Sequence, residues 1–437
     1  MSIAATADLI LPDATPLDSA AIVAKILRRL IPFLCVLFIV NYLDRTNVAM
    51  AKLRMLDDLR ITAAAYGFGA GLFFVGYFIF EVPSNLILEK VGARRWIARI
   101  MISWGVISAA MMFTRGTWSF YALRFTLGVA EAGFFPGIVL YLTYWVPAKQ
   151  RAQTLAAFLT STALSGVIGN PLAGALMKLD GIAGLHGWQW LFLLEGIPPV
   201  LLGIAILIFP LLPDRPIHAR WLSDDERRWI SEQLARDGVH PHVHHVADLP
   251  IAMADARLWL LSAIYFLLIM GLYGFIYWLP TLVHNFTRAS DFHVGLLSAI
   301  PYLIAAGSMV VIGRLADRRG ERQRYVAACA VIGAAGVAIV SQCHSAIPGM
   351  LALCLAAIGI FGTLGPFWTI PTRFLRGTAA AGGIAIVNSI GALAGFVAPS
   401  LIGKWFTIGL LVVAGSLVLG SVLVMCVPRS ADAGAAD

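Results

Sequence analysis

Residues 313–322 read Gly-Arg-Leu-Ala-Asp-Arg-Arg-Gly-Glu-Arg, and a related segment, residues 85–94, lies 228 positions earlier in the chain. Each segment follows a long apolar run, and Gly313 corresponds to Asn85. The segments match acid for acid, base for base and glycine for glycine, at Asp317 and Glu89, Arg318 and Lys90, Gly320 and Gly92, and Arg322 and Arg94. A repeat of this spacing predicts two halves of similar fold within one chain.

The composition around this repeat predicts an all-α polytopic membrane protein. The chain has 437 residues, of which 59% are hydrophobic and 13% charged, whereas soluble domains average about 25% charged residues. A span needs about 20 apolar residues, and the chain accommodates twelve. They are residues 30–50, 65–86, 95–114, 118–145, 152–177, 188–212, 257–286, 293–313, 325–344, 349–371, 379–402 and 406–427.

The distribution of basic residues predicts the orientation in the membrane. Most of the 32 Lys and Arg residues fall in loops on one side, and the positive-inside rule makes that side cytoplasmic. We therefore expect a multi-pass protein of the inner (plasma) membrane with both termini in the cytoplasm. The expected division is a tail (1–24), a six-helix half (25–212), a cytoplasmic linker (213–256), a second six-helix half (257–427) and a tail (428–437). The net charge of +8 then reflects topology, and no nucleic-acid partner is expected.

Four charged residues lie inside predicted spans: Asp44 and Arg45 in the first, Arg124 and Glu131 in the fourth. Each costs roughly 2.5–3.5 kcal/mol at bilayer depth, so such charges pair in the interior or line a polar path. Residues 124 and 131 share one helix face, with Gly128 between them, where we expect the first span to approach closely. Adjacent residues 44 and 45 point about 100° apart and must face different neighbours.

The loop pattern G-x-x-x-D-R-x-G-x-R resembles the cytoplasmic loop signature of the major facilitator superfamily, and the earlier copy departs from it at Asn85 and Glu89. Within that superfamily, Asn41-Tyr42-Leu43-Asp44-Arg45 and Arg124-x-x-x-Gly128-x-x-Glu131 are similar to the anion:cation symporter family. The resemblance covers essentially the whole chain. It implies the major facilitator fold and import of organic anions, such as hydroxy-acids, sugar acids or aromatic acids, together with protons or sodium.

The chemistry of the four charges suggests their roles. Asp44 and Glu131 can release protons, so they are the predicted proton-coupling residues. Arg45 remains charged and its planar fork suits a carboxylate, so we expect it to bind substrate, with Arg124 as a charge partner. The alternative is that all four charges only hold spans 1 and 4 together. The loop residues are expected to act in gating: Glu89, Lys90, Gly92, Arg94, Gly313, Asp317, Arg318, Gly320 and Arg322.

Neutral polar side chains within the spans are expected to complete a substrate pocket. The candidates are Tyr42, Tyr77, Tyr273, Tyr277 and Asn388; for Tyr273 and Tyr277 packing is the alternative. Glu81 and Glu195 are interpreted as gating or helix-end tethers. The pairs Gly67/Gly71 and Gly391/Gly395 have the small-xxx-small spacing that permits spans 2 and 11 to meet across the halves, although general packing would explain them as well.

Other function classes find little support. No nucleophile elbow, phosphate loop or metal-ligand spacing is present, so we expect no enzyme activity, no cofactor and no metal, with protons as the coupling ion. The histidines of residues 240–245 are interpreted as an incidental loop feature. Gly169-Asn170-Pro171 partly resembles an antiporter motif, so a proton-coupled exporter is the first alternative and a membrane sensor the second. The fold can work as a monomer, with a small organic anion and the lipid bilayer as partners.

Overall fold

The computed structural model describes residues 19–237, 255–371 and 378–428, and these residues form helices joined by short turns. The first half contains α1 (Ser19–Leu59), α2 (Ala63–Val91), α3 (Ala93–Ala110), α4 (Thr117–Glu131), α5 (Phe134–Thr143), α6 (Ala148–Leu159), α7 (Ser161–Leu176) and α8 (Gly187–Ile208). After α9 (Asp224–Arg236), the second half contains α11 (Ala256–Thr287), α12 (Asp291–Arg319), α13 (Arg322–Val340), α14 (Ala346–Trp368), α16 (Thr378–Lys404) and α17 (Phe406–Met425).

The predicted all-α membrane architecture is confirmed. Among the described residues, ten helical segments are long and apolar enough to cross a membrane, with α4 and α5 forming one of them. The pieces α6 and α7 lie where the fifth span is predicted, and α1 covers the first. The histidine-containing segment 240–245 lies outside the described residues.

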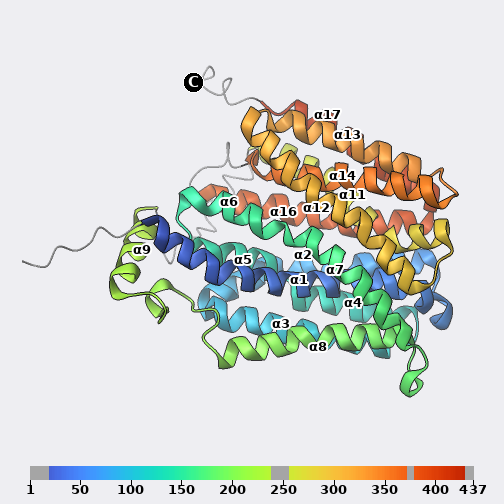
Figure 1. The fold of residues 1–437 in the computed structure, drawn as a ribbon, viewed down its shortest axis with the longest axis horizontal. Helices are drawn as coiled ribbons and strands as arrows, with labels where there is room; N and C mark the ends of the chain where they lie inside the picture. Colours follow the sequence, from blue (N-terminus) through green and yellow to red (C-terminus); the bar gives the residue numbers. More distant parts are fainter. Residues whose placement is uncertain (1–18, 238–254, 372–377, 429–437) are drawn as a thin grey trace, which may run out of the picture.

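The helices run roughly along the long axis of the molecule (Figure 1), with α9 at one end. We call the end that carries α9 the linker end and the opposite end the far end. In Figure 1 α3 and α8 lie along the lower edge and α13 and α17 along the upper edge. The two halves meet between these layers, where α2 packs on α16 and α7 packs on α12.

Glycines allow the two halves to approach closely. A Cβ atom on Gly67 would overlap the carbonyl oxygen of Pro399, and one on Gly295 would overlap that of Asn170. Spans 2 and 11 thus meet through small residues, as the glycine spacing predicts. Gly391 instead faces the ring of Tyr265 on α11.

The close approach at Gly128 involves a different helix from the one expected. A Cβ atom there would overlap the backbone carbonyl of Phe73 on α2, so the expectation that span 1 packs on Gly128 is wrong. The periodicity of a helix identifies which residues share a face, but it does not identify the helix that packs on that face.

The predicted loop motif fixes the end of α8 in the first half. Gly92 joins α2 to α3 with a φ of 95°, a conformation that favours glycine. The backbone N–H of Arg94 donates to Asp214 Oδ1 (2.8 Å), and the Arg94 guanidinium donates to the carbonyls of Ile206 (2.9 Å) and Leu207 (2.7 Å). The arginine therefore satisfies carbonyl groups that the end of a helix leaves without partners.

The second copy of the motif is organised around two of its residues. Gly320 ends α12 with a φ of 69°, and Arg322 begins α13. Glu89, Lys90 and Arg318 are exposed, whereas the side chain of Asp317 lies outside the described part of the structure.

The linker helix α9 docks on the start of α1. Ser223 and Glu226 form a capping box, in which Ser223 Oγ accepts from the Glu226 N–H at 3.2 Å. Lys25 Nζ donates to Glu226 Oε2 at 2.8 Å, and this hydrogen bond lowers the pKa of the Glu226 carboxyl. The indole of Trp221 stacks on that of Trp145, with ring centroids 5.8 Å apart. The linker is thus attached to the first half.

Candidate functional site

A cavity of about 740 Å³ lies between the two halves. Helices of both halves line it, with Tyr42 and Arg45 from α1 and Tyr273 from α11. Lys149 and Arg322, which begin helices at the linker end, also line the cavity. The cavity therefore extends from the middle of the molecule toward the linker end. At the far end the contacts of α2 with α16 and of α7 with α12 close it.

Arg45 lies at the inner end of this cavity, paired with Glu131. Its Nε donates to Glu131 Oε1 at 3.0 Å, and Nη2 donates to the same oxygen. Arg45 is 8% exposed and Glu131 is fully buried. The second carboxylate oxygen of Glu131 accepts no hydrogen bond from the described residues. The pair thus leaves acceptor capacity on the acid and accessible surface on the base.

A break between α4 and α5 positions Glu131. The acid is the last residue of α4, and Gly133 follows with a φ of 85° before α5 begins. A Cβ atom on Gly133 would overlap the side chain of Ser84 on α2. Glycine therefore meets both the backbone and the packing requirement of the break.

Aromatic rings surround the Arg45 guanidinium. The Cζ atom lies 5.3 Å from the ring centroid of Phe73, 5.4 Å from that of Tyr77 and 6.0 Å from that of Tyr42. Such distances permit cation–π attraction. Tyr273 packs on Phe74 with ring centroids 4.3 Å apart. Tyr42, Tyr77 and Tyr273, which the sequence analysis names as pocket candidates, thus line the cavity together with Arg45.

Asp44 points away from the cavity. Its carboxylate accepts from Trp104 Nε1 at 2.8 Å and from Ser108 Oγ at 2.7 Å, both on α3. Glu195 on α8, which packs on α1, is likewise a buried acid. The structure thus separates the two predicted proton-coupling acids: Glu131 contacts Arg45, and Asp44 contacts α3.

Arg124 makes no ion pair among the described residues, although it is fully buried. Its Nη2 donates to the carbonyl of Ala70 (3.2 Å) and to the hydroxyl of Tyr277 (3.3 Å). That hydroxyl in turn donates to the backbone carbonyl of Arg45 at 3.2 Å. Tyr277 therefore connects the two arginines across the halves and is not among the residues that line the cavity.

Asn388 belongs to a polar contact that crosses the halves. Its Nδ2 donates to Glu81 Oε1 at 3.0 Å, and Ser389 Oγ donates to Glu81 Oε2 at 2.7 Å. Asn388 also lines the cavity. Glu81 and Asn388 are each predicted from the sequence, but their contact, Ser389 and the α3 donors of Asp44 are not, because no residue pattern records which helices are neighbours.

Comparison with known proteins agrees with this architecture. The Major Facilitator Superfamily model matches residues 34–399. The chain belongs to the Major Facilitator Superfamily. A "Putative tartrate transporter" of Agrobacterium vitis is 46% identical over 94% of this chain and 95% of its own length. A "Putative metabolite transport protein NicT" of Pseudomonas putida is 45% identical over 93% and 94%, and a "Quinolone resistance transporter" of Acinetobacter baumannii is 42% identical over 87% and 88%.

A solved structure shows the same Major Facilitator fold. A bacterial homolog of the human lysosomal transporter Spinster, in an inward-facing and occupied conformation, superposes with a TM-score of 0.68 at 16% identity, covering 91% of this chain and 94% of that one. Together with the named relatives, the fold makes this chain a multi-pass inner-membrane transporter with twelve helices in two halves. It is not an enzyme, as its sequence predicts.

Proposed function

We propose that this transporter imports an organic anion by proton symport, as a member of the anion:cation symporter family. The observation that carries the proposal is the Arg45–Glu131 pair at the inner end of the cavity. A guanidinium is a permanent cation whose fork suits a carboxylate. Glu131 competes with substrate for that fork and stops competing when it is protonated. One proton and one anion are therefore coupled through the same arginine.

A transport cycle follows from this competition. With the far end open, Asp44 and Glu131 take up protons, and Arg45 is free to bind the substrate carboxylate. The halves, residues 25–212 and 257–427, then rock around the cavity. With the linker end open to the cytoplasm, Glu131 loses its proton and binds Arg45 again, which displaces the anion. The paired Arg45 in a cavity that extends toward the linker end matches this last step.

The lining supports a hydroxylated or aromatic carboxylate as substrate. Hydroxyl groups of Tyr42, Tyr77 and Tyr273, with the amide of Asn388, supply donors and acceptors around Arg45. The Agrobacterium vitis relative is named for tartrate, a hydroxy-acid. A net inward movement of one charge across 100 mV contributes about 2.3 kcal/mol, so a cycle that carries more protons than substrate charges gains from the membrane potential. A monomer suffices for the cycle. Protons are the coupling ion, and no cofactor takes part.

Export of a drug is the second candidate, because one relative is named for quinolone resistance. Arg45 at the inner end of the cavity disfavours organic cations, since like charges repel at short range in a medium of low polarity. A quinolone carries a carboxylate, so it also offers Arg45 an anionic group. The two candidate functions therefore differ in the direction of transport, which is import for the symporter and export for the drug transporter.

Uptake into proteoliposomes tests the proposal. An inward proton gradient is imposed, and accumulation of tartrate, gluconate and nicotinate is measured for the wild type, Glu131→Gln and the control Glu232→Gln. Glu232 is an acid on the exposed face of α9. We expect the wild type and the control to accumulate at least one acid, and Glu131→Gln to exchange that acid without accumulating it. Accumulation by Glu131→Gln would remove the coupling role of the acid. Proton release against a quinolone, with no acid moved, would establish the exporter.

A further inference from the structure

Lys52 is a buried basic residue near the far end of α1. It lies on α1, seven residues or two helical turns after Arg45 and on the same face. Only 5% of its surface is exposed. The ammonium makes no hydrogen bond and no ion pair within the described part of the chain. It is therefore a basic group, about 10 Å from the Arg45 level along α1, that lacks an acceptor.

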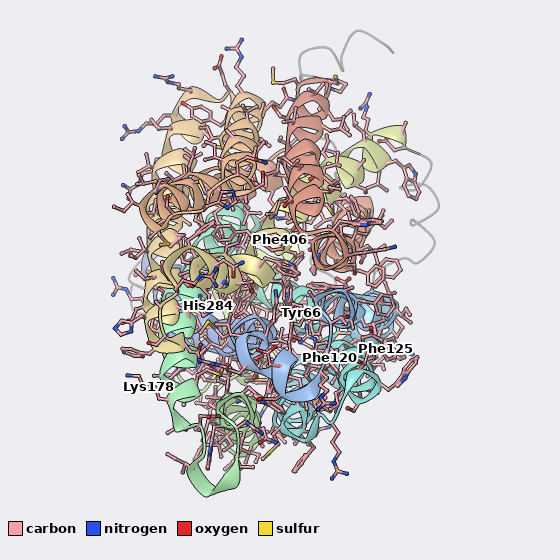
Figure 2. All side chains as sticks on the ribbon, turned by 90° about the vertical axis from the view of Figure 1, so that its right-hand side faces the viewer. Tyr66, Phe120, Phe125, Lys178, His284 and Phe406 are labelled. Atoms are coloured by element: carbon pink, nitrogen blue, oxygen red, sulfur yellow. The ribbon has the colours of Figure 1, made fainter. Side chains whose placement is uncertain are left out.

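Aromatic rings from both halves enclose this ammonium. Nζ lies 3.0 Å from the ring centroid of Trp278 on α11 and 4.7 Å from that of Tyr66 on α2. Trp278 packs edge-on against Tyr66 (6.0 Å) and Phe406 (5.3 Å). Figure 2 looks onto the far end and labels Tyr66 near the centre of that face. The rings thus cover Lys52 where the two halves meet at the closed far end.

The enclosure depends on contact between the halves. Trp278 belongs to the second half, whereas Lys52 and Tyr66 belong to the first. Separation of the halves at the far end would withdraw Trp278 and leave the ammonium with three unused donors facing the opening. A ring face attracts a cation but accepts no conventional hydrogen bond. A carboxylate supplies both the charge and the acceptors that Lys52 lacks.

We infer that Lys52 is an external capture site for the substrate carboxylate, occupied before the anion reaches Arg45. The inference rests on the proposed import of an organic anion. Trp278 and the anion compete for the same ammonium: the anion binds when the far end is open, and the ring replaces it when the far end closes. The Tyr277 hydroxyl donates to the Arg45 carbonyl, and the Trp278 ring covers Lys52. Adjacent residues of α11 therefore contact Arg45 and Lys52, the two proposed anion sites on one face of α1.

The test measures transport from each side separately. Proteoliposomes of defined orientation carry the wild type, Lys52→Met, Lys52→Arg and Lys178→Met, with radiolabelled tartrate, gluconate and nicotinate as probes. Lys178 is the matched control, because its ammonium lies 3.5 Å from the Phe292 ring across the halves at the far end but is exposed. Size-exclusion profiles establish that each variant folds.

If Lys52 captures the anion, its substitution changes transport from the far side more than transport from the linker side. We expect Lys52→Met to raise KM for uptake from the far side about tenfold, with kcat and the KM for efflux from the linker side within twofold of the wild type. Lys52→Arg keeps most of the affinity, and Lys178→Met behaves like the wild type. External KM of the wild type rises with ionic strength, and this dependence weakens in Lys52→Met.

Other outcomes overturn the inference. An unchanged external KM in Lys52→Met removes the capture role. An equal change in KM for transport from both sides, or the same change in Lys178→Met, would show that Lys52 acts only in closing the far end. If the wild type accumulates none of the three acids, the proposed function fails and this inference fails with it. If the wild type accumulates an acid and Lys52→Met retains its external KM, the inference fails alone.

Discussion

At the scale of single residues, the site depends on which acceptors each arginine contacts. Arg45 uses two nitrogen atoms on one oxygen of Glu131, whereas Arg124 donates to a carbonyl and a phenol. A buried arginine without an acid is costly unless other acceptors compensate. The proposed exchange of one carboxylate for another therefore belongs to Arg45, while Arg124 joins α4 to α2 and α11 through Nη2.

Arg45→Lys tests whether the planar guanidinium of Arg45 is needed to bind the substrate carboxylate. A lysine keeps the charge but cannot present two donors in one plane, so we expect KM for the transported acid to rise at least tenfold, or about 1.4 kcal/mol, in a protein that still inserts. Uptake kinetics measure this effect, and the yield of membrane-inserted protein is the control. An unchanged KM would show that Arg45 does not hold the carboxylate.

At the scale of helices, close packing at a glycine also joins α2 to α4. Gly128 on α4 faces the backbone of Phe73, so even one methyl group there requires the two helices to separate. That separation would also disturb Phe73, whose ring lies near both Arg45 and Arg124. The packing of two neutral residues therefore supports the geometry of the charged ones.

Gly128→Ala is expected to lower the thermal stability of the detergent-solubilised protein. Overpacking of this kind costs about 1–3 kcal/mol, which we expect to appear as a lower Tm. The matched control is Gly415→Ala on α17, because no atom lies within 4 Å of a Cβ at that position. Equal melting temperatures for the two variants would show that the contact between α2 and α4 accommodates an added methyl group.

At the scale of the whole molecule, one end is open and the other closed. The cavity extends to Lys149 and Arg322 at the linker end. At the far end, Arg54 Nε lies 2.8 Å from Asp291 Oδ2 across the halves. This asymmetry corresponds to one of the two states that an alternating-access cycle requires.

Cysteine labelling measures this asymmetry. In a background in which the five native cysteines are replaced, we expect Met309→Cys on the cavity wall to react with a maleimide and Tyr66→Cys at the far end to resist it. A transported acid should slow the first reaction. Faster labelling at residue 66 than at residue 309 would show that the far end is the open one.

Sequence reasoning recovered the parts of this molecule that follow from local patterns. The two copies of the loop motif, at Arg94 and Arg322, the twelve helical positions and the capping box at Ser223 are each local patterns, made of residues close together in the chain. It did not recover which helices pack together: Gly128 faces α2, Asp44 faces α3, and Lys52 is buried between halves. Helical periodicity fixes the face on which a side chain lies, but neighbours are set by the packing of the whole bundle.

The size of the cavity has a consequence for the solvent. A volume of about 740 Å³ corresponds to on the order of 25 water molecules at about 30 Å³ each. In the proposed cycle each closure releases most of them, because a small acid fills only part of the space. Osmotic pressure therefore favours a state in which this cavity is closed, and a solute too large to enter the cavity, such as a polymer, is expected to shift the transporter toward that state.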